Sequence, residues 1–242
     1  MPSVATRPRE FVRVAGPDAE DFLQRMVSND VAANGDCEAL LLTPKARIIA
    51  PLRIVRRSPE DFLVMTEPGL GETVRTQLLR SRFAAKVEIE PEEHQSWLVI
   101  GEGEVLDQRP EGEEASDEDV ERWRIEAGLP RWGSELDDTI LPAEAGLERT
   151  HISFSKGCYP GQEPIARQHY RGKVNRRLCV LDVDGDAAPG DELLRHGKTV
   201  GRITSAAGDV ALGYVRTEVP AGEALPVSGK QVSARVRRDA EA

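Results

Sequence analysis

The sequence predicts an α+β protein, built from strand-rich α+β units and ending in a small antiparallel β-barrel. Three observations support this prediction. Up to Ile100, amphipathic helical patterns alternate with short apolar runs that are typical of strands. Aromatic residues form only 5% of the chain, so the core is mainly aliphatic. After Arg177 the pattern changes to short apolar strands separated by tight glycine turns.

The first helical pattern follows Pro17. Its apolar positions share one helical face and are Ala19, Phe22, Leu23, Met26 and Val27. Strand patterns follow at 38–42, 47–55 and 62–66, then a second helix at 70–83 and further strands at 86–89 and 95–100. We therefore expect helices to cover one face of an antiparallel sheet.

Most of the negative charge lies in residues 88–121. This range holds 14 acidic residues and one basic residue, so the net charge of −10 leaves +3 for the rest of the chain. The overall charge therefore does not exclude an anionic ligand. Within this range, residues 101–119 are acidic and poor in apolar side chains, and they predict a solvated, mobile loop.

The loop is followed by a third helix. Ser116 and Asp119 have the spacing of a capping box, and Gly128 is typical of a helix C-terminus.

The strand patterns LCVLDV, TVGRITS, VALGYVR and VSARVRR then predict the barrel. We divide the chain into an α+β region at 1–172 and a barrel domain at 173–242.

Several classes of protein are excluded or disfavoured. No run approaches the roughly 20 apolar residues of a membrane span, and no signal-peptide pattern follows the first residues, so we expect a cytoplasmic protein. The three cysteines lack CxxC spacing and the histidines lack paired spacing, so neither a disulfide framework nor a metal site is expected. No phosphate-binding GxxxxGK[ST] loop occurs.

The segment 153–167 is the most unusual part of the chain, because a glycine-flanked Cys158 follows Lys156 in a turn-rich loop. Pro164 suits the first turn of a helix whose free backbone N–H groups point toward this loop. A nearby cation and a helix N-terminus both favour the thiolate form, which is the nucleophilic one. On spacing alone, an inert and buried thiol is an equally good interpretation.

The run Lys156-Gly157-Cys158-Tyr159, followed by Gly161-Gln162-Glu163 and Arg167, closely resembles the KGCYxGQE signature of the YgfZ family. Further segments resemble the family in the same order: SNDV at 28–31, LLTPKARI at 41–48, RIEAGLPRWGSELDDTILPAEAGL at 124–147 and GYVR at 213–216. The resemblance spans nearly the whole chain. It implies a ring of α+β subdomains around a central folate channel, followed by the barrel, in a protein of iron-sulfur cluster assembly or repair.

The resemblance also implies roles for individual residues. Cys158 would supply thiol chemistry and Lys156 would support its thiolate. A tetrahydrofolate ligand needs a carboxylate for the pterin edge and basic groups for its glutamate tail. These residues are Glu126 and Arg167, with further ligand contacts from Tyr159, Gln162 and Glu163. Without the resemblance, Glu126 and Arg167 would be interpreted as solvated surface residues.

The YgfZ family is part of the aminomethyltransferase superfamily, and this sequence differs from the superfamily pattern at two positions. One bears on the reaction mechanism and the other on the backbone conformation. Pro51 stands near the position where glycine-cleavage aminomethyltransferases carry a catalytic aspartate, so turnover is uncertain. Ala46 occupies a position that is usually glycine.

Three functions therefore remain open. The leading one is a folate-binding protein that works with iron-sulfur assembly machinery or client enzymes. The alternatives are a folate-dependent aminomethyl or methyl transferase and a non-enzymatic RNA or protein adaptor that uses the basic run 167–177. RNA is the less favoured partner, and neither DNA nor a membrane is expected.

Overall fold

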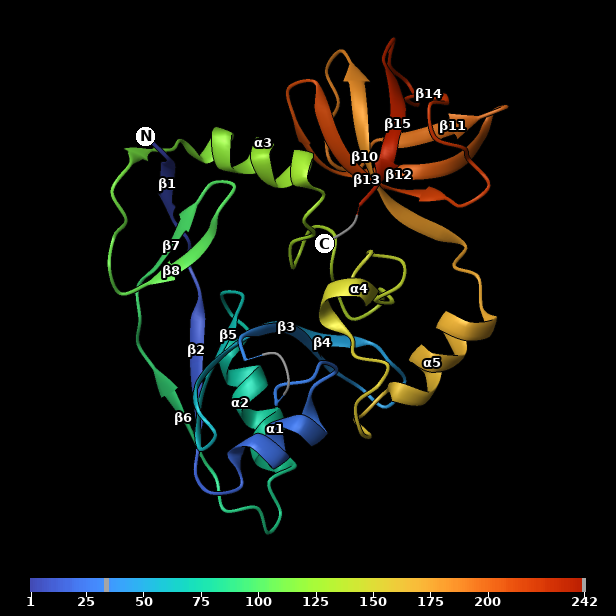
Figure 1. The fold of residues 1–242 in the computed structure, drawn as a ribbon. Coiled ribbons are helices and arrows are strands. Elements are labelled where there is room, and N and C mark those ends of the chain that lie inside the picture. Colours follow the sequence, from blue (N-terminus) through green and yellow to red (C-terminus); the bar gives the residue numbers. More distant parts are fainter. Residues whose placement is uncertain (33–34, 241–242) are drawn as a thin grey trace. The chain divides into compact units, whose positions relative to one another are not determined.

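The computed structural model describes residues 1–32 and 35–240. The chain divides into two compact units, the first formed by residues 1–114 with 148–167 and the second by residues 115–147 with 168–242 (Figure 1). Each unit combines a mainly antiparallel sheet with helices, which confirms the predicted α+β class. The predicted boundary between residues 172 and 173 stays a prediction.

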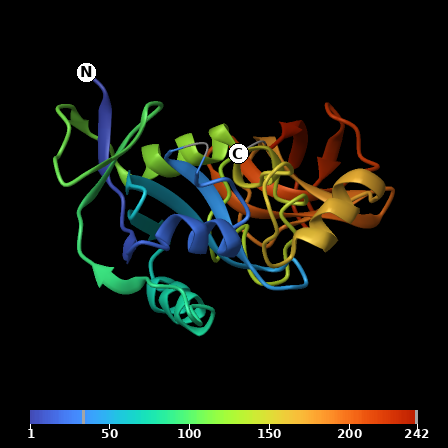
Figure 2. The same cartoon turned by 60° about the horizontal axis from the view of Figure 1, so that its bottom comes forward.

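A five-stranded antiparallel sheet forms the centre of the first unit. Its strand order is β3-β4-β5-β2-β6, with β2 at Glu10–Ala15, β3 at Cys37–Leu42, β4 at Ile48–Ser58, β5 at Asp61–Thr66 and β6 at Glu88–Glu92. Helix α1 (Ala19–Met26) packs against β5, and α2 (Gly71–Arg80) packs against β2, β4 and β6. Figure 2 shows both helices on one side of the sheet, as expected.

The apolar face predicted for the first helix is confirmed. Ala19, Phe22, Leu23 and Met26 are all buried, as is Val27 directly after the helix. The second helix ends at Arg80 rather than Phe83. Phe83 does not pack on the unit, because its side chain is 92% exposed.

A second sheet corrects the predicted mobile loop at 101–119. Its order is β8-β7-β1-β9, with β1 at Ser3–Thr6, β7 at Ser96–Val99, β8 at Gly103–Leu106 and β9 at Glu113–Glu114. β8 pairs with β7 as an antiparallel hairpin, and β9 pairs in parallel with β1. Backbone pairing with neighbouring strands therefore orders parts of a segment whose composition alone predicted a loop.

The second unit begins with α3 (Asp117–Ala127). The predicted capping box is confirmed, since Ser116 Oγ accepts the N–H of Asp119 and the Asp119 carboxylate accepts the N–H of Ser116. Gly128 ends the helix with a left-handed φ of 77°, as predicted.

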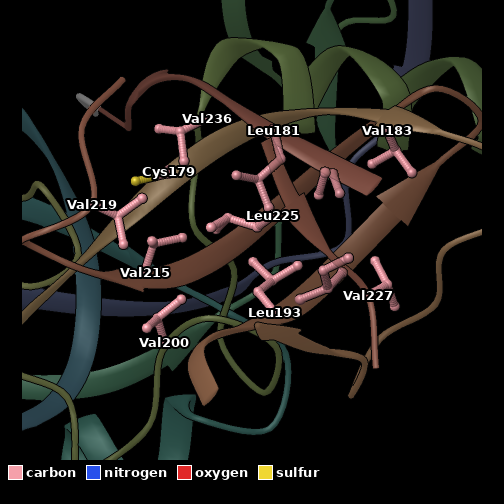
Figure 3. Close-up of a cluster of buried hydrophobic side chains, with 13 residues drawn as sticks. Cys179, Leu181, Val183, Leu193, Val200, Val215, Val219, Leu225, Val227 and Val236 are labelled. Atoms are coloured by element: carbon pink, nitrogen blue, oxygen red, sulfur yellow. The ribbon is translucent and has the colours of Figure 1, made fainter. Parts of the chain in front are cut away.

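The rest of the second unit is the predicted barrel. Six strands follow the order β11-β12-β13-β10-β15-β14, with β10 at Arg176–Asp184, β11 at Glu192–Arg195, β12 at Lys198–Ala207, β13 at Val210–Arg216, β14 at Ala224–Pro226 and β15 at Ser233–Asp239. A bridge between Leu193 and Val227 nearly closes the sheet on itself. Aliphatic side chains from these strands fill its interior, together with the buried Cys179 (Figure 3).

Two short helices complete the fold. α4 is Glu148–His151 and α5 is Gln162–Arg171. Within residues 1–32 and 35–240, no helix is long and apolar enough to cross a membrane.

A buried ion pair joins α3 to the barrel inside the second unit. Arg124 is 4% exposed and donates to Glu135 (2.9 Å), which is 1% exposed, and to the hydroxyl of Ser205 on β12 (2.7 Å). Ser205 in turn donates to the other oxygen of Glu135 (2.6 Å). Every charge in this cluster therefore has a hydrogen-bonded partner, as a buried charge requires.

Substituting Arg124 by Leu is expected to lower the free energy of unfolding by about 3–5 kcal/mol, because it leaves the Glu135 carboxylate buried without its cation. The double variant R124L/E135L should lose less than the two single variants together. Urea unfolding measures both. The control is Arg122→Ala on the same helix, whose exposed pairs with Glu126 and Asp209 should each contribute no more than about 1 kcal/mol. If the double variant lost as much unfolding free energy as the two single variants together, Arg124 and Glu135 would not be coupled.

Candidate functional site

Ser28 and Asn29, directly after α1, tie together separate backbone segments of the first unit. The Ser28 hydroxyl donates to the carbonyl of His151 (2.6 Å) and accepts the N–H of Leu40 (2.8 Å). The Asn29 amide donates to the carbonyls of Glu38 (2.7 Å) and Thr150 (2.8 Å). Both side chains are buried, so these bonds fix α4 and the start of the following loop against β3.

Lys156 lies inside this arrangement. Its side chain is 8% exposed, and its Nζ donates to the carbonyl oxygens of Val27 and Asn29, both at 2.7 Å. Burial lowers the pKa of Lys156 to about 8. The ammonium also lies 5.4 Å from the ring centroid of Tyr159. The structure thus places the Lys156 ammonium on two backbone carbonyls, where it holds the loop to the end of α1.

Gly161 fixes the other end of the loop. It has a φ of 85°, and a Cβ there would lie 2.7 Å from the carbonyl oxygen of Thr43. The loop therefore lies directly on the turn between β3 and β4. Ala46 in that turn also has a left-handed φ, of 59°, and is 1% exposed. This backbone conformation explains why glycine is usual there, since an L side chain is strained by it.

Cys158 lies between these two fixed points and is exposed. All three cysteines of the chain lie in its described part. The other two have surroundings that differ from those of Cys158. Cys37 is partly buried, and burial raises its pKa to about 11, whereas Cys179 is fully buried with a pKa raised to about 12. Of the three thiols, Cys158 is therefore the most accessible to a reaction partner.

Tyr159 is buried, unlike its neighbour. It is 7% exposed, and burial raises its pKa to about 12. Its hydroxyl has no hydrogen-bond partner among the residues that the structure describes. A buried phenol without a partner carries a desolvation cost, so the Tyr159 hydroxyl could donate or accept one further hydrogen bond.

The remaining candidates of this unit lie on α5. Gln162 begins the helix and is partly exposed. Glu163 and Arg167 have side chains that are 91% and 68% exposed and lie one turn apart, 3.9 Å between charged atoms. An exposed pair at this distance stabilises the helix little, so both groups are accessible to a ligand.

Glu126 belongs to the second unit. Its side chain is 41% exposed and pairs with Arg122 at 3.0 Å. The neighbouring Arg124 anchors the same helix through the buried pair described above. The carboxylate is therefore accessible and is carried by a helix that is fixed in place.

Sequence reasoning missed the structural roles of Ser28, Asn29 and His151. The SNDV segment at 28–31 carries a signal for Ser28 and Asn29, because serine and asparagine side chains bond readily to nearby backbone groups. No group of three or more histidine, cysteine or carboxylate side chains suited to a metal ion occurs in the described ranges.

Comparisons with known proteins identify a matching domain and several relatives. Residues 175–240 match the model of the CAF17 C-terminal beta-barrel domain. The chain is 24% identical to the mouse mitochondrial iron-sulfur cluster assembly factor IBA57, over 88% of this chain and 77% of that protein. It is 26% identical to the tRNA-modifying protein YgfZ of an Enterobacter species, over 73% of this chain and 70% of that protein.

The fold has a close match among solved structures. The glycine cleavage system aminomethyltransferase T from Bartonella henselae superposes with a TM-score of 0.86, covering 98% of this chain and 85% of that chain at 18% identity. The chain thus has an aminomethyltransferase-like fold. In sequence, it is similar to proteins of the YgfZ and IBA57 type.

Replacing Gly161 by Ala is expected to lower the free energy of unfolding by at least about 2 kcal/mol, because a Cβ there meets backbone atoms and a left-handed φ strains it further. The matched control is Gly157→Ala in the same loop, where a Cβ meets nothing within 4 Å. Chemical denaturation measures both variants. Equal stabilities would show that the loop does not rest on the Thr43 turn.

His151 should make stability depend on acid pH. It is 9% exposed, and burial lowers its pKa to about 4 from 6.5. As the pH falls from 6.5 to 4, the unfolded chain binds a proton at His151 and the folded chain does not, so stability is lost, by up to about 3 kcal/mol.

His151→Phe should remove this component, visible as a smaller loss of unfolding free energy between pH 7 and pH 4.5. The control is His196→Asn, an exposed histidine in a left-handed turn that Asn tolerates. If H151F and the parent chain lose the same free energy on acidification, His151 is not buried neutral.

Proposed function

We propose that this protein binds tetrahydrofolate and assists the assembly or repair of iron-sulfur clusters through the thiol of Cys158. The observation that carries the proposal is an exposed thiol on a loop that Lys156 and Gly161 fix on either side. Relatives named for iron-sulfur cluster assembly support the choice of process. We further propose that it works in the cytoplasm.

One thiol has limited chemistry toward a cluster. A cluster is usually held by about four thiolates, and the described residues contain no cluster of three or more histidine, cysteine or carboxylate side chains suited to a metal ion. Cys158 would therefore contribute one ligand or a transient sulfur bond, with the remaining ligands coming from an assembly protein or a client enzyme. Exposure of the thiol suits such a transient encounter.

The chemistry of two accessible charged groups supports the choice of folate as ligand. Glu126 presents a half-exposed carboxylate that suits the amidine-like edge of the pterin, and Arg167 presents an exposed guanidinium that suits the glutamate tail. Gln162 and Glu163 offer further polar contacts on α5. Tyr159, being buried, would act by supporting the loop or through its free hydroxyl.

A transferase activity is less well supported. Pro51 lies in β4, and its carbonyl accepts the hydroxyl of Thr66 (2.9 Å), so this position provides no acid or base. Aminomethyl transfer would need a carboxylate from elsewhere. The adaptor alternative rests on the basic run 167–177 and on the relative named for tRNA modification, and it requires no turnover.

Cys158→Ser is expected to reduce the activity of iron-sulfur enzymes under oxidative stress to the level of cells that lack the protein, because serine removes the thiol and keeps the size of the side chain. Cys37→Ala is the matched control, since its thiol is partly buried. Aconitase activity in complemented cells measures the effect. Full activity with C158S would refute the thiol mechanism.

Glu126→Gln is expected to weaken tetrahydrofolate binding by about 10- to 100-fold, because a charge-assisted hydrogen bond becomes a neutral one. Glu118→Gln, an exposed carboxylate in the first turn of the same helix, should bind normally. Calorimetric titration measures both. C158S should also bind folate normally, which separates the ligand site from the thiol, whereas unchanged binding by E126Q would remove Glu126 from the site.

A further inference from the structure

The segment between α2 and β6 forms a projecting tip of the first unit, at the lower edge of Figure 1. Phe83 occupies this tip with a side chain that is 92% exposed. The N–H of Ala85 donates to the carbonyl of Arg82 (2.9 Å), so Phe83 is the first central residue of a tight turn. A phenylalanine so exposed at a turn has no part in the core of the unit.

The backbone of Phe83 is also in a costly conformation. Its φ is 43°, in the left-handed region that turns of this kind normally fill with glycine or asparagine. Ala46 has a similar φ but is buried in a tight contact. For Phe83, by contrast, burial offers no compensating gain. The placement of an aromatic ring here therefore calls for a functional explanation.

The tip is held by several hydrogen bonds. The N–H of Lys86 donates to the carboxylate of Asp18 (2.7 Å), and the hydroxyl of Ser81 donates to the carbonyl of Gln77 (3.1 Å). Gly16 fixes the far side, since a Cβ there would lie 2.3 Å from the Lys86 carbonyl oxygen. The ring is thus presented on an ordered support rather than on a free chain end.

Three basic residues lie within three positions of Phe83 in the sequence. Arg80, Arg82 and Lys86 are exposed, and no side-chain partner is found for them among the described residues. Other arginines of this unit, such as Arg13 and Arg57, pair with carboxylates. The neighbouring Asp18 is already bonded to the backbone N–H of Lys86. Three cations against this one carboxylate leave the tip with a net positive charge beside an aromatic face.

We propose that this tip binds single-stranded nucleic acid, with a base stacked on Phe83 and phosphates near Arg80, Arg82 and Lys86. Aromatic faces flanked by cations are the usual means of binding single strands without sequence readout. A protein partner needs a larger apolar centre, and in the described part of this unit the other large exposed apolar residues are Met1 and Val105. A lone ring also gives a membrane little to bury.

The test measures binding of a fluorescent oligouridylate of about 12 nucleotides by anisotropy, at several salt concentrations. Phe83→Ala should weaken binding at least about fivefold. The double variant R80A/R82A should weaken binding and reduce the slope of affinity against salt by about one unit. A deoxythymidylate of the same length should bind within about threefold, because stacking and charge do not read the 2′-hydroxyl.

Three controls make the test decisive. Phe83→Gly should weaken binding as much as Phe83→Ala while stability stays equal or rises, because glycine removes the ring and fits the left-handed φ. Lys198→Ala, an exposed cation of the second unit, should bind normally. An oligomer of abasic sugar phosphates should bind the parent chain and F83A equally, since no base is left to stack.

Some results would overturn the proposal. They are failure of the parent chain to bind any single strand, full binding by F83G, or tighter binding to anionic vesicles or to duplexes than to single strands. C158S should bind the oligonucleotide normally, so the proposal does not depend on the function proposed for the thiol.

Discussion

The Lys156 ammonium, bonded to the carbonyl oxygens of Val27 and Asn29, is the interaction on which the candidate site depends. A buried ammonium is costly unless its protons are satisfied, and here two strong acceptors come from the end of α1. Breaking both bonds would leave the ammonium buried without a hydrogen-bond partner. The start of the Cys158 loop is therefore confined to one position, and Gly161 confines its end. Cys158 can be exposed and yet held in place because Lys156 and Gly161, on either side of it in the chain, are both buried.

The sequence predicted those parts of the fold whose signals are local. Periodicity identified α1 and its buried face, and the spacing of Ser116, Asp119 and Gly128 identified both ends of α3. Alternating strands and glycine turns identified the barrel. In each case the deciding residues lie within a few positions of one another, so no knowledge of the remote chain was needed.

Features that depend on remote partners were missed. β9 forms because it pairs with β1, more than 100 residues earlier, and its composition alone indicates a loop. The sequence placed Lys156 two residues from Cys158, whereas its hydrogen-bond acceptors come from Val27 and Asn29. The same limit applies to Arg124, because its buried partner Ser205 lies on a barrel strand far along the chain. Such long-range contacts follow from topology rather than from local pattern.

Arg124 and Glu126, two residues apart on α3, have different roles: the first is a buried structural residue and the second is the proposed ligand contact. Residues two apart on a helix face different directions, so Arg124 is buried while Glu126 remains half-exposed. Arg124 satisfies Glu135 and Ser205 and thereby fixes the helix, which leaves the Glu126 carboxylate accessible on a rigid support. If Glu126 binds the pterin, its geometry is thus set by a neighbour that never touches the ligand, and a loss of folate binding on changing Arg124 would reflect a displaced helix rather than a lost contact.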